Sequence, residues 1–362
     1  MPDSHRPVTA LRVGIAAAVC ALSLSISVSA RRGGSQATDP SPPQTASAPV
    51  STSAPARGVV AVMRRDGLMV PFASFKGTRW STPWPASTRL VELPVDVDSV
   101  PEDWWGGDPP GLLTVHLPGG VIRPVTMRAP RVYRSFCQTR IGMVTDYRSA
   151  EPIPLPPPSP YPKDGLVLPA GMELLPIDSI SPAAPDTLAL AQSLMPAFDK
   201  AEDQTLATIH GAEQWVHPVN GAARHARPVV IEAWYRAPMD EPGWIASYIE
   251  AARVYGPGLV PGDAGCGLET VFTGWVHTNT VDPKKSRWQI TARVTYCDRN
   301  GVKYMLPFGR VHVGGQLYWI YQFSSFNDEW YEVARMTPVK MAFVVESYGG
   351  GTRGCAQSAP GR

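Results

Sequence analysis

Short apolar runs separated by turn residues dominate the first part of the chain that can form a core. Residues 59–63 and 68–75 are apolar and flank Asp66 and Gly67, a dipeptide that favours a two-stranded hairpin. Pro118, Gly119 and Gly120 separate a second pair of runs in the same way. These patterns predict a small β domain over residues 58–149, with its further strands at residues 112–117, 121–127 and 132–145.

The period of the apolar positions changes near residue 186. Asp186 or Thr187 can cap a helix, and Pro196 is expected to kink or end it. The apolar positions of this helix share one face and are Leu188, Ala191, Leu194, Met195 and Phe198.

The pattern beyond the helix is typical of strands. Residues 229–236 alternate, and residues 244–255 fit either a helix or a long strand. Residues 267–345 predict an antiparallel meander, in which Pro307 and Gly309 indicate a bulge. Its turns are expected at residues 281–284, 298–301, 314–315 and 325–328.

Together these elements predict an α+β, mainly antiparallel β protein. It would have a small N-terminal β domain and a C-terminal helix-plus-meander sheet domain over residues 185–350. Much of the chain's proline lies outside these domains. Residues 31–57 are rich in Ser, Ala and Pro and predict a disordered tether, residues 150–184 a proline-rich spacer, and residues 351–362 a flexible tail.

The first thirty residues have the layout of a secretory signal peptide. Arg6 and Arg12 precede an apolar run, and Ala30 ends a stretch of small residues that predicts cleavage after it. An uncleaved anchor is the alternative, because Arg31 directly after that point is unfavourable for processing. A lipoprotein site at Cys20 is less favoured. No other segment is long and apolar enough to span a bilayer.

Cysteine content agrees with export to a periplasmic, cell-surface or secreted location. Removing Cys20 with the signal leaves an even number of cysteines, which is typical of disulfides in an oxidising compartment. A turn near residue 282 would place two of them opposite each other. The predicted pairs are Cys266 with Cys297 and Cys137 with Cys355.

Charge and motifs exclude several classes of function. The chain has 33 basic and 31 acidic residues with no basic cluster, which argues against nucleic acid as a partner. The nucleophile elbow, zinc-protease helix, phosphate-binding loop and dinucleotide fingerprint are all missing from the sequence. We therefore expect no cofactor.

Histidines and carboxylates offer weak candidates for chemistry. His210, His217 and His225, with Glu213, could ligate zinc or copper, but their spacing matches no known ligand pattern. Exposed loop histidines without a ligand are commoner. His277 and His312 are expected as half-buried sheet residues. A glycosidase pair among Asp328, Glu329 and Glu332 is disfavoured, because Glu329 and Glu332 would point to opposite faces of a strand.

Aromatic residues are the most suggestive feature, since the chain has 11 Trp and 12 Tyr. Trp104 and Trp105 are adjacent, so one ring could pack inward while the other meets a ligand. Trp319 and Tyr321 lie on a strand that carries large rings on both faces. Burial of these rings in a core is the alternative, and it is the more favoured of the two.

The sequence therefore favours an exported envelope protein without catalytic activity that binds a polymer or a protein partner. The predicted binding residues are Trp104, Trp105, Trp319 and Tyr321. One alternative is an exported hydrolase that acts on glycans or peptides. Another is a structural subunit of a surface assembly.

Overall fold

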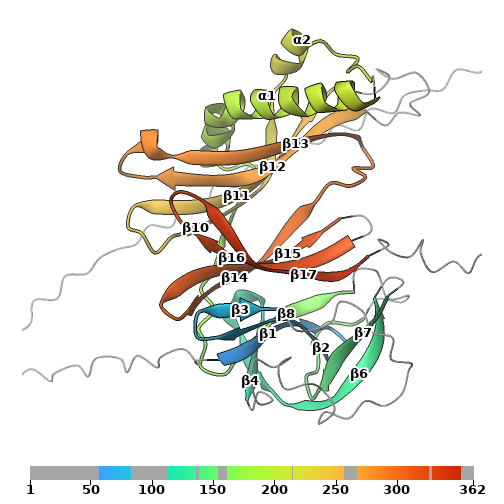
Figure 1. Ribbon diagram of the computed structural model, residues 1–362, viewed down its shortest axis with the longest axis vertical. Helices are drawn as coiled ribbons and strands as arrows, with labels where there is room; N and C mark the ends of the chain where they lie inside the picture. Colours follow the sequence, from blue (N-terminus) through green and yellow to red (C-terminus); the bar gives the residue numbers. More distant parts are fainter. Residues whose placement is uncertain are drawn as a thin grey trace, which may run out of the picture. The chain divides into compact units, whose positions relative to one another are not determined.

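A computed structural model describes residues 57–82, 112–135, 138–153, 161–213, 215–256, 267–325 and 328–351. All of them belong to one compact unit, Ser51–Arg362. The expected mainly antiparallel β fold with one long helix is confirmed (Figure 1). The signal peptide, almost all of the tether and almost all of the C-terminal tail lie outside the described residues.

The first sheet is an eight-stranded antiparallel sheet that curls into a half-barrel (Figure 1). The hairpins expected around Asp66-Gly67 and around residues 118–120 both form. Gly67 adopts a φ of 81°, a conformation that glycine reaches without strain. The strands are β1 (Arg57–Arg64), β2 (Leu68–Lys76), β3 (Arg79–Ser81), β4 (Leu113–His116), β5 (Ile122–Val125), β6 (Met127–Ser135), β7 (Gln138–Thr145) and β8 (Lys163–Pro169).

Strand β8 is a difference from the expected spacer at residues 150–184. It pairs with β1 on one side and β4 on the other, in the middle of the first sheet. Leu166, Val167 and Leu168 are fully buried there. An apolar run of this kind gains more from burial on both faces of a sheet than from a solvated, extended conformation. Residues 154–160, the proline-dense part of the spacer, lie outside the described residues.

The second sheet has five strands in the order β13-β12-β11-β10-β9. The ambiguous segment at residues 244–255 forms strand β11 within it. One face of this sheet is covered by a long helix, α1 (Pro185–Glu213), and a short helix, α2 (Gly221–His225), follows. The strands are β9 (Asp178–Ile180), β10 (Val230–Pro238), β11 (Trp244–Val254), β12 (Leu268–Asn279) and β13 (Arg287–Tyr296).

Pro196 does not end helix α1, which corrects one of the two expected outcomes. The helix continues to Glu213, well beyond the proline. Leu194 and Phe198 on either side of it are buried against the second sheet. Packing of this apolar face outweighs the single backbone hydrogen bond that proline removes.

The central sheet has four strands in the order β14-β15-β16-β17. The expected single meander is therefore divided between two sheets. Asn300 and Gly301 form a turn, but it connects β13 of the second sheet to β14 of the central sheet instead of closing a hairpin. The bulge expected between Pro307 and Gly309 is present. The strands are β14 (Tyr304–Val313), β15 (Gln316–Ser324), β16 (Asp328–Met336) and β17 (Met341–Gly351).

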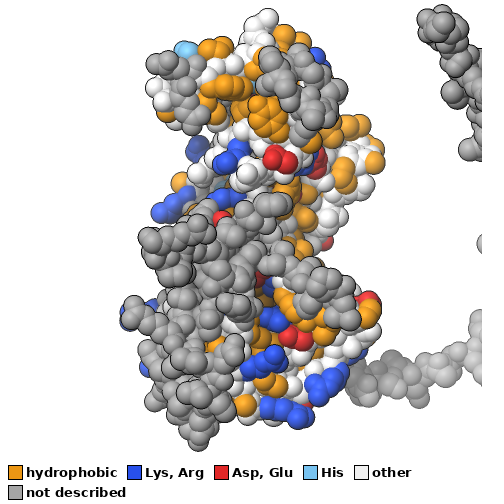
Figure 2. Space-filling view, turned by 90° about the vertical axis from the view of Figure 1, so that its right-hand side faces the viewer, with side chains coloured by type: hydrophobic (Ala, Val, Ile, Leu, Met, Phe, Trp, Pro, Cys, Tyr) orange, Lys and Arg blue, Asp and Glu red, His pale blue; other side chains and the backbone are white. Residues whose placement is uncertain are grey.

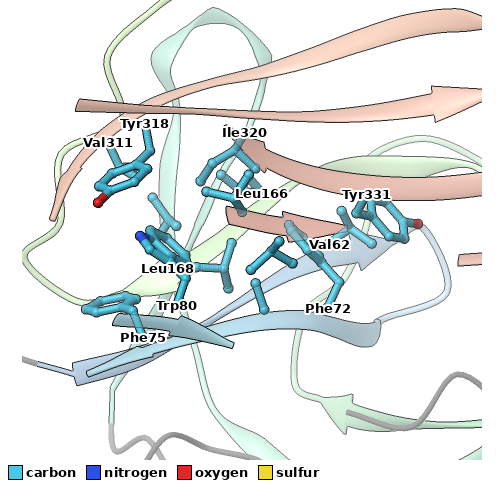
Figure 3. Close-up of a cluster of buried hydrophobic side chains, with 14 of the residues drawn as sticks. Val62, Phe72, Phe75, Trp80, Leu166, Leu168, Val311, Tyr318, Ile320 and Tyr331 are labelled. Carbon is cyan, nitrogen blue, oxygen red and sulfur yellow. The ribbon is translucent and has the colours of Figure 1, made fainter. Parts of the chain in front are cut away.

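The three sheets and α1 stack in layers, with the central sheet covered on both faces (Figure 1). Figure 3 shows the core between the first and central sheets, where Phe72 and Trp80 of the first sheet face Tyr331 and Tyr318 of the central sheet. A division into two domains at the spacer is not confirmed, because this core takes side chains from both sides of it. None of the helices in the described part of the chain is long and apolar enough to cross a membrane.

Candidate functional site

A pocket of about 420 Å³ lies where the second and central sheets meet. Strands β12 and β13 form one side of it, and the turn between β16 and β17 forms the other. We call it the edge pocket, because β13 is the outermost strand of its sheet. Its lining residues are Trp275, His277, Ser286, Arg287, Trp288, Gln289, Val339, Lys340 and Met341.

The register of β12 against β13 brings the pocket's side chains together. Trp275 and His277 are two residues apart on β12 and therefore face the same side. Gln289 lies opposite Trp275, and Arg287 lies opposite His277. Opposed residues of an antiparallel pair share a face, so these four side chains point toward the central sheet.

Trp275 anchors the pocket on the aromatic core between the two sheets. Its ring centroid lies 5.2 Å from that of Trp319, 5.7 Å from that of Tyr321 and 5.2 Å from that of Tyr248. The rings meet edge to face or tilted, which is a favourable geometry for aromatic pairs. Only 6% of Trp275 is exposed. The tryptophan therefore cannot reorient when a ligand enters.

Two hydrogen-bonded turns fix the rim of the pocket. The Ser286 hydroxyl accepts a hydrogen bond from the Asn279 backbone N–H at 3.0 Å across the β12–β13 turn. In the β16–β17 turn, the Thr337 hydroxyl donates to the Lys340 carbonyl at 2.8 Å. The Thr337 backbone N–H donates to the same carbonyl at 3.0 Å. Arg287 and Lys340, the two basic residues of the rim, therefore lie in or next to turns that hydrogen bonds hold in place.

His277 contributes a neutral hydrogen-bonding group at the back of the pocket. Burial lowers the pKa of its imidazole, and this outweighs hydrogen bonding to the backbone of Pro338 and Thr337, which raises it. The residue is 5% exposed, and its Nε2 has no hydrogen-bond partner among the described residues. A buried ring nitrogen without a partner is costly, so a bound group that satisfies it would gain binding free energy.

The charges of the edge pocket are cationic and unpaired. Arg287 and Lys340 are exposed, and neither forms an ion pair with the described residues. No carboxylate is present among the described residues that line the pocket. Two available cations, a neutral imidazole and an aromatic floor are suited to an anionic ligand that also offers an apolar face.

The predicted binding residues do not meet in this pocket. Trp104 and Trp105 lie outside the described residues. Trp319 and Tyr321 are fully buried between the central and second sheets, which corrects their expected contact with a ligand. The second sheet removes their large apolar area from water, and both rings pack against Trp275.

The histidines of the predicted cluster do not converge on one point. Among the described residues, no group of three or more histidine, cysteine or acidic side chains could hold a metal ion. His210 Nδ1 lies 3.3 Å from the Trp215 carbonyl, and His225 Nε2 lies 3.3 Å from Asp203. His217 is turned to the backbone of Val219. The three rings therefore have separate partners. The side chain of Glu213 is outside the described residues.

The carboxylates of β16 are structural. Glu329 faces the first sheet, where it forms a buried ion pair with Lys163 of β8 and accepts from the Tyr331 hydroxyl. Glu332 faces the second sheet and accepts from Trp330 Nε1 at 2.8 Å. Burial raises the pKa of Glu332. As expected from their spacing, the two glutamates lie on opposite faces of the strand and do not form one site.

The other predicted chemical groups occupy ordinary positions. His312 is exposed and lies 3.1 Å from Asp240, which corrects its expected half-burial. Cys297 directly follows β13, whose Tyr296 pairs with Leu268 at the start of β12. Cys137, Cys266 and Cys355 are outside the described residues, so both disulfides stay predictions.

Sequence reasoning missed Trp275, Arg287 and Lys340. A usable signal existed: Trp275 and His277 alternate on a strand, and basic residues occur in the turn that follows. Lys340 could not be added to them, because it reaches the pocket only through the packing of the central sheet on the second sheet.

Comparison with known proteins identifies no relative. No family model matches the chain, and neither does any curated protein or solved structure. The functional inference therefore depends on the geometry of the site.

Proposed function

We propose that this chain is an exported, non-catalytic binding protein, and that its edge pocket holds an acidic saccharide of an envelope polymer. The observation that carries the proposal is that Arg287 and Lys340, on the rim of a pocket whose floor is Trp275, have no ion-pair partner in the part of the chain that the structure describes. An acidic sugar offers a carboxylate or sulfate to the cations and C–H groups to the small exposed part of the Trp275 ring.

The lining of the pocket favours binding over hydrolysis. A glycosidase needs two carboxyl groups across the scissile bond, and the lining that the structure describes has none. His277 provides one neutral imidazole, which can donate or accept a hydrogen bond to a sugar hydroxyl. The rigid turns on both sides reduce the entropic cost of binding.

Export enters the proposal from the sequence. Residues 1–30 carry the signal-peptide pattern, and residues 31–57 would hold the folded unit away from the surface to which the chain is attached or on which it acts. The proposed disulfides, Cys266–Cys297 and Cys137–Cys355, would form in the same oxidising compartment.

The proposal is tested by titrating the full chain with hexagalacturonate, an acidic oligosaccharide, and with cellohexaose, a neutral one of equal length. We expect saturable binding of the acidic sugar only. The double variant Arg287→Glu, Lys340→Glu should weaken it at least tenfold, because charge-assisted hydrogen bonds are worth about 1.5–3 kcal/mol each. Raising the salt concentration should weaken binding further.

A matched control keeps the change in net charge the same. Lys76→Glu, Arg79→Glu reverses two exposed cations on the first sheet and should bind hexagalacturonate like the wild type. Equal loss in both double variants would show that only the overall charge matters. Equal binding of cellohexaose would contradict the anionic preference.

A further inference from the structure

A second pocket, of about 500 Å³, lies beside the last turns of α1. We call it the helix pocket. Figure 2 shows hydrophobic side chains gathered at the level of α1 and α2. Unlike the edge pocket, its walls are mainly apolar. Its lining residues are Leu206, Ala207, His210, Trp215, Val216, His217, Pro218, Val219, Asn220 and Arg224.

His217 is the polar group whose environment indicates a ligand site. It is 8% exposed, and its Nδ1 lies 3.0 Å from both the backbone N and the carbonyl O of Val219. The backbone therefore occupies Nδ1 in either tautomer. Nε2 is buried and has no hydrogen-bond partner among the described residues. It is a donor when Nδ1 accepts and an acceptor when Nδ1 donates.

The ring of His217 is held in place by its neighbours. Its centroid lies 4.7 Å from that of Tyr255 and 5.7 Å from that of Trp215, edge to face in both pairs. The Tyr255 hydroxyl donates in turn to Glu202, which is fully buried and forms an ion pair with Arg253 at 2.6 Å. The imidazole therefore packs against Tyr255, whose position is fixed by a buried network of hydrogen bonds and ion pairs.

The one cation that lines the helix pocket is already paired with carboxylates. Arg224 Nη2 lies 2.8 Å from Asp203, and its Nη1 donates to the Val219 carbonyl at 2.9 Å. Its Nε lies 3.5 Å from Glu202. Burial lowers the pKa of His217, so the imidazole is neutral at pH 7. Asp203 and Glu202 already neutralise this guanidinium, although its Nε has no hydrogen-bond partner among the described residues, and a cation would meet it as a like charge.

We infer that the helix pocket binds an uncharged small molecule with an apolar or aromatic body and one hydroxyl group, and that His217 Nε2 hydrogen-bonds this hydroxyl. A hydroxyl both donates and accepts, so it satisfies Nε2 in either tautomer. The apolar body replaces water against Leu206, Trp215 and Val216, the last of which is 67% exposed. The inference is independent of the edge pocket and of the proposed function.

The test compares 2-naphthol with naphthalene, which lacks the hydroxyl, by NMR titration of the full chain labelled with ¹⁵N in histidine and tryptophan. We expect 2-naphthol to shift the His217 Nε2 and Trp215 Nε1 resonances saturably and to leave those of Trp275 unchanged. It should bind about tenfold more tightly than naphthalene, as expected for one buried hydrogen bond. No saturable shift at His217 would overturn the inference.

Two variants separate the hydrogen bond from the shape of the pocket. His217→Asn keeps a side-chain oxygen that can accept the Val219 N–H and removes the Nε2 position, so the tenfold preference for 2-naphthol should vanish. His217→Gln retains a polar atom near the Nε2 position and should keep part of that preference. His312→Asn, at an exposed histidine on the central sheet, should leave it unchanged. A preference that survives His217→Asn in full would contradict the assigned role of Nε2.

Discussion

The edge pocket and the helix pocket each contain a buried histidine whose Nε2 has no hydrogen-bond partner among the described residues, yet their surroundings are opposite. Behind the edge pocket lies a layer of aromatic rings, and its cations, Arg287 and Lys340, form no ion pair with any residue that the structure describes. Behind the helix pocket lies a buried ion network, and its cation, Arg224, is paired. A cation near a pocket therefore says little about the ligand until its existing partners are known.

The first prediction breaks the support of the helix pocket and has the largest expected effect. Glu202→Ala leaves Arg253 buried with only the partly exposed Asp199, and it removes the acceptor of Tyr255 and Thr270. An uncompensated buried charge costs about 3–5 kcal/mol, and we expect the upper end of that range in the free energy of unfolding. Denaturant titration measures it. A loss below about 1 kcal/mol would show that the network is not buried in solution.

The second prediction breaks the support of the edge pocket. Trp275→Ala removes a ring that contacts Tyr248, Trp319 and Tyr321, and it should lower the free energy of unfolding by about 4 kcal/mol. Trp288→Ala, at a ring that is 53% exposed on the neighbouring strand, should cost about 1 kcal/mol or less. Equal losses in the two variants would contradict the assignment of Trp275 to the core.

The third prediction concerns the pH dependence of the free energy of unfolding, which a buried glutamate behind the edge pocket should control. Burial raises the pKa of Glu250, on the strand next to Trp275, from 4.5 to about 7, while the Met305 backbone N–H that donates to it at 2.6 Å lowers it. Between pH 4.5 and about 7, the Glu250 carboxyl is therefore protonated in the folded state and ionised in the unfolded state. Stability from this group is complete below pH 4.5 and falls by about 3 kcal/mol as pH rises to 7.

The control for the pH prediction is Glu250→Gln, which keeps the shape of the side chain and cannot ionise. It should remove most of the decrease in unfolding free energy between pH 4.5 and 7. Part should remain, since burial also raises the pKa of Glu332 in the same layer. An unchanged pH profile in Glu250→Gln would contradict the raised pKa.

Local elements of the fold could be predicted from the sequence, and the order of the layers could not. The Asp66-Gly67 hairpin depends on neighbouring residues, so its signal lies in a short window. Strand β8 pairs with β1, and beside this pair Arg65 contacts Asp164, 99 residues further along the chain. No local pattern contains that information. The turn at Asn300-Gly301 is similar, because its residues fit a hairpin as well as a crossing between sheets.

The candidate sites show the same limit. The alternation of Trp275 and His277 on a strand is visible in the sequence, but the unpaired state of Arg287 and Lys340 is a property of the packed sheets. Trp319 and Tyr321 attract attention as adjacent large rings, and only the position of the second sheet shows that they are core. Aromatic content therefore left open whether these rings are core or binding residues, and it did not reveal the edge pocket.

The central claim, that the edge pocket holds an acidic saccharide, is tested most directly by NMR of the full chain labelled with ¹⁵N in tryptophan and histidine, titrated with trigalacturonate. The account predicts saturable shifts of Trp275 Nε1 and His277 Nε2, with the resonances of Trp215 and His217 in the helix pocket unchanged. Saturable shifts confined to other residues, or no shifts at millimolar sugar, would contradict it.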